Sequence, residues 1–143
     1  MTGHGHVVAR LLRMVQRQNR GPRWGTARVD GPSMLPTLCP GDLLLLRYGA
    51  RPRPGAVVVA RFGGGVVVVK RAVERRTRFD GSPGWWLRGD ATDEEAAAAG
   101  AVGPVVDSRR RGPVADEEVL AVATARLWPR PRRLVRRAPR APE

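Results

Sequence analysis

Short apolar runs, separated by turn-forming residues, dominate the chain from residue 26 onward. Six of these runs have the length and the valine- or leucine-rich character of strands, and they cover residues 26–31, 42–48, 56–62, 65–76, 84–89 and 119–128. Tight turns are indicated by the glycine- and proline-rich stretches at 52–55, 63–65 and 80–84. Residues 91–103 are acidic and then alanine-rich, which indicates a loop or one helical turn. The pattern predicts a mainly β fold, a single antiparallel β barrel or sandwich.

The N-terminal part of the chain has a different pattern. Apolar side chains recur at helical spacing over residues 7–18, with arginines opposite, which predicts a short amphipathic helix. We expect this helix to pack on the body of the protein, and weak binding to an anionic membrane surface is the alternative. The chain then divides into a basic N-terminal segment (1–25), a β domain (26–128) and a Pro/Arg-rich tail (129–143) that is extended or disordered.

Composition limits the classes to which the protein can belong. The 143 residues suffice for one domain, and an apolar content of 42% allows a real core. No apolar run approaches the roughly 18–20 residues of a membrane span, and the arginine-interrupted N-terminus lacks the pattern of a secretory signal. The single cysteine, Cys39, excludes an internal disulfide and a cysteine-based zinc site. We therefore expect a protein of the reducing cytoplasm with no integral membrane contact, no cofactor and no metal.

The basic excess has two interpretations. Lys and Arg number 26 against 13 Asp and Glu, a formal net charge of +13, and much of the excess lies near the two ends. An anionic partner such as a nucleic acid could bind this surface. The alternative is a solvated basic face in a sequence that favours Arg, Ala, Gly and Pro, as a GC-rich genome does. We favour the second interpretation and expect no nucleic-acid partner.

One basic residue departs from this bias. Of the 26 basic residues, 25 are Arg and one, Lys70, is Lys. An arginine stays protonated at any ordinary pH, whereas a buried lysine can lose its proton and then accept another. The valine run Val66–Val69 precedes Lys70 and would bury it. Lys70 is therefore a candidate general base, and an ordinary surface lysine is the alternative.

A candidate nucleophile lies in the segment VDGPSMLPTLCPGD at residues 29–42. Gly31 and Pro32 make a turn that can present the Ser33 hydroxyl, although a serine in such a turn often only bonds its own backbone. Both histidines of the chain lie within the first six residues, so a Ser-His-Asp triad has no suitable histidine. Lys70 is then the available base for a serine nucleophile.

Three boxes along the chain resemble the signature of the signal peptidase I superfamily of serine peptidases. In order, the boxes are Ser33–Leu38 with Gly41–Asp42, Val66–Arg71, and Gly89–Asp90 with Asp107–Val114. The resemblance implies a serine–lysine dyad. Neutral Lys70 takes the proton of Ser33, the serine attacks a peptide carbonyl, and water hydrolyses the acyl-enzyme.

The resemblance also implies what surrounds the nucleophile. The backbone N–H of Ser33 would hold the oxyanion. Bacterial relatives often add a serine hydroxyl two residues earlier, but that position here is Gly31, so this second donor is missing. Met34 would form the floor of a shallow substrate pocket beside the scissile bond, and a core methionine is the alternative.

Three residues would support the site. Asp107 and Arg109 would form a structural ion pair near it, and a surface pair of little energetic value is the alternative. Many relatives orient the lysine with a hydroxyl two positions before this Asp, where the chain has Val105. Ser108 is therefore a candidate for orienting Lys70.

A small soluble branch of this superfamily has this length, no membrane anchor and a tail like Trp128-Pro129-Arg130, and it matures nickel-type superoxide dismutase. The resemblance implies a serine endopeptidase that removes an N-terminal leader from a protein precursor, with the nickel superoxide dismutase precursor as its expected partner. Two other classes stay open. One is a self-cleaving repressor-type Ser-Lys regulator, for which Ala99–Gly100 is a cleavage dipeptide on the unusual, downstream side of Ser33. The other is a non-enzymatic basic module that binds nucleic acid.

Overall fold

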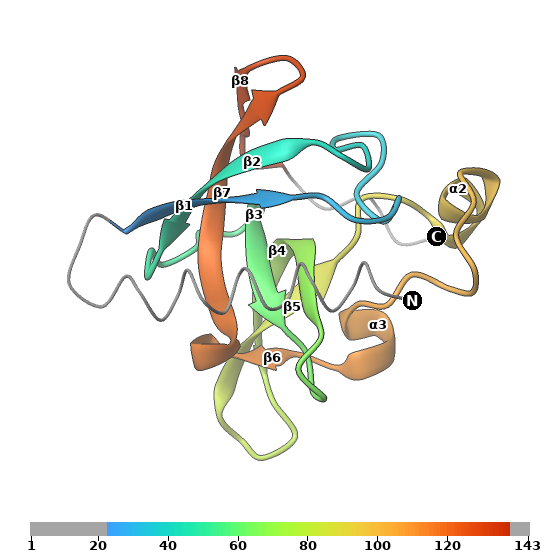
Figure 1. The fold of residues 1–143 in the computed structure, drawn as a ribbon. Coiled ribbons are helices and arrows are strands. Elements are labelled where there is room, and N and C mark those ends of the chain that lie inside the picture. The colour runs from blue at the N-terminus through green and yellow to red at the C-terminus, as the bar shows by residue number, and fades with distance from the viewer. Residues whose placement is uncertain (1–22, 138–143) are drawn as a thin grey trace.

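A single curled antiparallel sheet makes up most of the molecule, and two short helices lie together beside it (Figure 1). The structure is a computed structural model that describes residues 23–137, so the helix expected over residues 7–18 lies outside the described residues. The strands are β1 (Trp24–Arg28), β2 (Leu43–Tyr48), β3 (Ala56–Arg61), β4 (Val67–Thr77), β5 (Pro83–Arg88), β6 (Val114–Ala115), β7 (Val119–Trp128) and β8 (Arg132–Arg133). The helical elements are α2 (Asp93–Ala98), α3 (Ser108–Arg111) and the 3-10 turn η1 (Asp116–Glu118). The prediction of a mainly β, antiparallel fold is confirmed.

The last long strand, β7, lies inside the sheet between β2 and β3. The order is β1-β2-β7-β3-β4-β5-β6, with β8 paired to β7. Among the described strands no pairing joins β1 to β6, so the sheet is an open half-barrel rather than a closed barrel. Register shifts between β2 and β7 mark bulges, which increase the local twist and let the sheet curl.

The core lies on both sides of β3, whose first five residues, AVVVA, are apolar without alternation because both of its faces are buried. One cluster includes Leu44, Leu46 and Val57, and a second includes Val58 and Leu87. Since β4 pairs with β3, its first half is buried within the same body, and its second half is exposed. Lys70 is in the buried half.

The structure contains several short elements that the sequence pattern did not predict or left undecided. Residues 91–103 contain a six-residue helix, α2, which begins where Thr92 Oγ1 accepts a hydrogen bond from Glu95 N at 3.1 Å. The elements α3, β6 and β8 have two to four residues each and were not predicted. The tail from residue 129 folds back on the sheet through β8, and Arg137 N donates to the Gly55 carbonyl at 3.1 Å.

Candidate active site

The Ser33 hydroxyl is presented by the loop that follows β1. Gly31 has φ 81°, in the left-handed region that favours glycine, and turns the chain just before the serine. Two backbone hydrogen bonds then shape the loop, from Leu35 N to Pro32 O at 3.2 Å and from Leu38 N to Met34 O at 2.9 Å. These turns set the local shape of the loop.

Close packing against the segment after β5 positions the Ser33 backbone. Ala91 N donates to the Ser33 carbonyl at 3.0 Å. Gly89 lies so near that a Cβ at this position would be 2.5 Å from Ser33 O and 3.0 Å from Val105 Cγ1. Real Cβ atoms do not approach a carbonyl oxygen so closely, so a residue larger than glycine at position 89 would displace the serine loop.

Lys70 reaches the serine from β4, where it lies opposite Val58 of β3. Only 4% of Lys70 is exposed. Its Nζ is 2.6 Å from Ser33 Oγ, a hydrogen-bond distance between residues that are 37 positions apart in the chain. A buried amine in direct contact with a hydroxyl can exchange a proton with it without an intervening water.

Burial changes the protonation of this amine. It lowers the pKa of Lys70 from 10.5 to about 8, because an ammonium ion shielded from water loses its hydration. The Asp107 carboxylate acts in the opposite direction and raises this pKa, and the positive charge of Arg109 lowers it. Near neutral pH, about one molecule in ten then carries an uncharged Lys70 ready to accept a proton.

Asp107 is completely buried, with 0% exposed, and its carboxylate is shared among several donors. It accepts from Gly89 N and from Arg109 N, each at 3.0 Å, and the second bond caps α3. The Arg109 guanidinium pairs with it at 3.0 Å. Asp107 thus connects the N-terminal end of α3 to Gly89, which lies beside the serine loop.

Three residues that the resemblance linked to the site have other surroundings. The Ser108 hydroxyl accepts from Leu87 N at 2.8 Å, a bond that attaches α3 to β5, and its role in orienting Lys70 stays a prediction. Met34 is 1% exposed and belongs to the core cluster that contains Leu38, so its role as the floor of a substrate pocket stays a prediction. A Cβ at Gly31 would meet no atom of residues 23–137 within 4 Å other than those of its chain neighbours, so there is space beside the turn that precedes Ser33.

A second polar network, not recognised from the sequence, ties the serine loop to the end of β4. Asp90 accepts from Arg71 Nε at 2.8 Å and from Arg71 Nη2 at 2.7 Å, and it also accepts from Thr37 Oγ1. Arg71 is 3% exposed and additionally donates to the Gly55 carbonyl at 2.7 Å. Two-pronged arginine–carboxylate pairs fix geometry as well as charge. Since Arg71 follows Lys70 and Thr37 lies in the serine loop, the network connects the Ser33 loop to the strand that carries Lys70.

The signal for this network was present in the chain. Thr37, Arg71 and Asp90 each lie inside one of the three boxes that carry the resemblance. Their spacings of 53 and 19 residues have no periodicity, so only the fold reveals that they meet.

A free strand edge leads to Lys70. β4 pairs with β3 from Val67 to Ala72, whereas its pairing with β5 starts at Arg71. Within residues 23–137, the β5 side of residues 67–70 therefore has no strand partner. An extended peptide can add to such an edge through main-chain hydrogen bonds.

The described residues contain no group of three or more His, Cys, Asp and Glu that could hold a metal ion. No helix between residues 23 and 137 is long and apolar enough to cross a membrane.

Comparison with known proteins gives one family. The sequence model described as Peptidase S24-like matches residues 9–80, half of the chain. Ser33 and Lys70 both lie inside the matched span, and the box at Gly89–Asp90 lies beyond it. No curated protein matches the chain.

Replacing Lys70 with methionine tests the burial of the amine through stability. Since the folded pKa of about 8 lies below the ordinary 10.5, protonated Lys70 opposes folding at pH 7, and this penalty disappears as the pH rises from about 8 to 10.5. We expect Lys70→Met to raise the free energy of unfolding at pH 7 by roughly 1–3 kcal/mol, and the gain to shrink towards pH 10.5. Urea unfolding at several pH values measures it, with Ser33→Ala as the control. A gain that does not change with pH would contradict a buried, destabilised ammonium.

A methyl group at position 89 tests the close approach of the serine loop. Gly89→Ala should lower the free energy of unfolding by about 1–3 kcal/mol, because the new Cβ overlaps the Ser33 carbonyl. Gly63→Ala is the matched control, since a Cβ there meets no atom within 4 Å. Thermal and urea unfolding of the two variants gives the comparison, and equal stability of both would show that the packing at Gly89 is loose.

Proposed function

Because the chain belongs to the Peptidase S24-like family, we propose that it is a serine endopeptidase in which Ser33 is the nucleophile and Lys70 the general base. One observation carries the proposal, namely the 2.6 Å separation between the buried Lys70 Nζ and Ser33 Oγ. Both residues lie within the span that matches the family. A lysine with a pKa of about 8 suits this role, because it can be neutral before the reaction and protonated during it.

In the proposed mechanism, neutral Lys70 takes the proton of Ser33 as Oγ attacks the substrate carbonyl. The peptide C–N bond then breaks, and the Lys70 ammonium returns its proton to the leaving amine. A water molecule, deprotonated by the again neutral Lys70, attacks the acyl-enzyme ester. The ester C–O bond to Oγ breaks, Ser33 regains its proton from Lys70, and the carboxylic product leaves.

The oxyanion of each tetrahedral intermediate needs donors that point to it. The backbone N–H of Ser33 is the proposed donor. Pro32 has no N–H, and Gly31 has no hydroxyl. The open space beside Gly31 can admit a substrate or a water molecule as the second donor.

The proposed substrate is an extended segment of a protein precursor. The unpaired edge of β4 at residues 67–70 supports this, because a peptide that adds to it as a strand runs towards Lys70 and Ser33. From the resemblance of the three boxes and of the tail at Trp128–Arg130, we propose that the enzyme removes an N-terminal leader, with the nickel superoxide dismutase precursor as substrate.

A self-cleaving repressor-type regulator is the second candidate, because the Peptidase S24-like match is compatible with it as well. The dipeptide Ala99–Gly100 does not support self-cleavage. Ala99 caps the C-terminal end of α2, and Gly100 has φ 97° with its N–H donated to the Ala97 carbonyl at 3.0 Å. A scissile bond that binds as an extended strand would need this helix end to unfold first.

Processing of a precursor tests the proposal directly. We expect the purified protein to release the leader of a nickel superoxide dismutase precursor. Ser33→Ala, which removes the nucleophile, and Lys70→Arg, whose guanidinium cannot accept the proton, should each cleave at least about a thousandfold more slowly. Ser82→Ala, in the turn between β4 and β5, is the matched control and should cleave normally. Mass spectrometry of both chains identifies the product. Efficient cleavage by Lys70→Arg would refute the proposed base, and a shortened enzyme with an intact precursor would favour self-cleavage.

The pH profile tests the environment of the base. We expect kcat/KM to rise with pH along a limb with an apparent pKa near 8, since only uncharged Lys70 is active. Arg109→Gln should move this limb to higher pH by up to about one unit, because it removes a positive charge that lowers the pKa of Lys70. Arg111→Gln, in the same helix, should leave the limb in place. A limb that does not move in Arg109→Gln would contradict the electrostatic account.

A further inference from the structure

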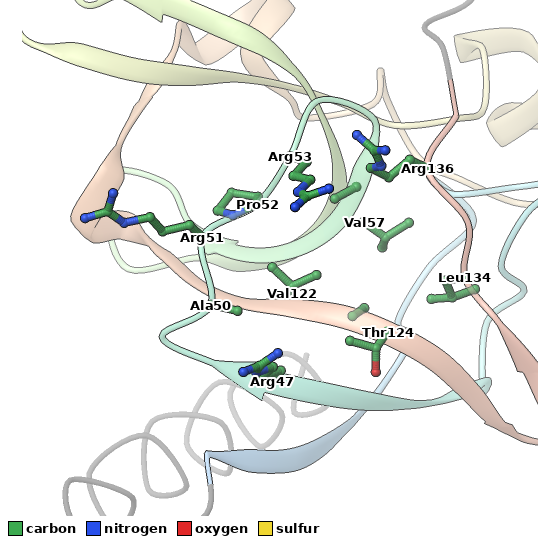
Figure 2. Close-up of a pocket in the computed structure, with 12 residues that line it drawn as sticks. Arg47, Ala50, Arg51, Pro52, Arg53, Val57, Val122, Thr124, Leu134 and Arg136 are labelled. Atoms are coloured by element: carbon green, nitrogen blue, oxygen red, sulfur yellow. The ribbon is translucent and has the colours of Figure 1, made fainter.

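A cavity of about 260 Å³ lies between β2, β3 and β7, and it contains neither Ser33 nor Lys70 among its lining residues (Figure 2). Its apolar lining comes from three separate segments, and it includes Val57, Val122, Ala123 and Leu134. Val57 and Ala123 are opposite each other in the pairing of β3 with β7, and Leu134 follows β8. Leu134 and Arg136 thus complete a hollow that the sheet strands begin.

Four arginines surround this apolar lining, and Figure 2 shows them on several sides of it. They are Arg47 of β2, Arg51 and Arg53 of the loop before β3, and Arg136 of the tail. All four are exposed. The guanidinium of Arg47 lies over the Trp24 ring, 5.8 Å from its centre. Within residues 23–137, none of the four forms an ion pair with a carboxylate.

Elsewhere on the described surface, paired and unpaired arginines are mixed. Some arginines there face an acid, as Arg75 faces Asp116 and Arg110 faces Asp93, and others within residues 23–137, such as Arg111 and Arg130, form no ion pair but do not gather around an apolar hollow. Around the cavity, four like charges gather without such a partner, which produces a locally positive field. An anionic ligand would relieve their repulsion.

We propose that this cavity is a docking site for a segment of a partner protein in which one apolar side chain is flanked by Asp or Glu. The apolar lining would take the side chain, and the arginines would pair with the flanking carboxylates. The volume of 260 Å³ is below the roughly 300–1,000 Å³ of typical small-molecule sites, so it suits a single side chain of a peptide.

Two other occupants fit the observations less well. A single-stranded nucleic acid binds best where aromatic rings stack on its bases, and the residues that line this cavity include no aromatic side chain. The chain's own first 22 residues contain no acidic residue, so they cannot neutralise the arginines. The occupant that the charges favour is an acidic segment of another protein.

Peptide binding tests the proposal independently of the peptidase activity, because the Ser33→Ala protein is used throughout. The probe is a fluorescein-labelled peptide, Gly-Asp-Glu-Leu-Asp-Glu-Gly, and fluorescence polarisation at 0.15 M salt gives its Kd. We expect Arg51→Gln/Arg53→Gln/Arg136→Gln to weaken binding at least about tenfold. The matched control, Arg76→Gln/Arg111→Gln/Arg130→Gln, removes the same charge away from the cavity and should change Kd less than about threefold.

Two further probes separate the cavity from general charge attraction. Replacing the probe's Leu with Ser should weaken binding at least about fivefold, because the apolar lining then loses its ligand. An oligothymidylate with four phosphates should bind more weakly than the peptide. Equal losses in the two triple variants, equal binding of the Ser probe, tighter binding of the oligothymidylate, or no binding of the peptide would each overturn the proposal.

Discussion

The removal of one amine from water is the constraint on which the rest of this structure depends. Lys70 touches Ser33 Oγ at 2.6 Å, and that contact is chemically useful only if the amine is uncharged for part of the time. Burial within the sheet lowers the pKa of Lys70 to about 8. Asp107 acts against this, and the Arg109 guanidinium both neutralises that carboxylate and repels a proton on Lys70. The site therefore balances a carboxylate needed for structure against an amine needed without charge.

The fold has to bring a loop and a strand from distant parts of the chain to within a hydrogen bond of each other. It does so with contacts of two kinds. The Ser33 backbone is packed against Gly89 and bonded to Ala91, so the segment after β5 sets its position. Arg71 then connects the end of β4 to the same segment through Asp90. One short stretch, residues 89–91, thus contacts both the Ser33 loop and the strand that carries Lys70.

The hydrophobic pattern was sufficient to predict the long strands and the burial of Lys70, because valine runs bounded by glycine turns have few alternatives. It could not predict β6 and β8, because two residues are too few to show an alternation of apolar and polar positions. It could not predict that Thr37, Arg71 and Asp90 meet, since their contact depends on sheet register and not on spacing. Nor could it decide between core and pocket for Met34, because a methionine suits both, and the side chain lies among buried residues that include Leu38. Nothing in the pattern indicated that the Ser108 hydroxyl accepts from the Leu87 N–H of β5, because this contact depends on the packing of α3 against that strand.

Lys70 is the only lysine among the 143 residues, so its side chain can be observed alone. Protein labelled with ¹³C and ¹⁵N in lysine should give one resonance for the folded side chain, and its chemical shift against pH reports the pKa of Lys70 directly. The account predicts a midpoint near 8 in the folded protein and a return to about 10.5 on unfolding in urea. A folded-state midpoint at or above 10.5 would mean that the amine is solvated or firmly paired with a carboxylate, and the serine–lysine mechanism would be contradicted.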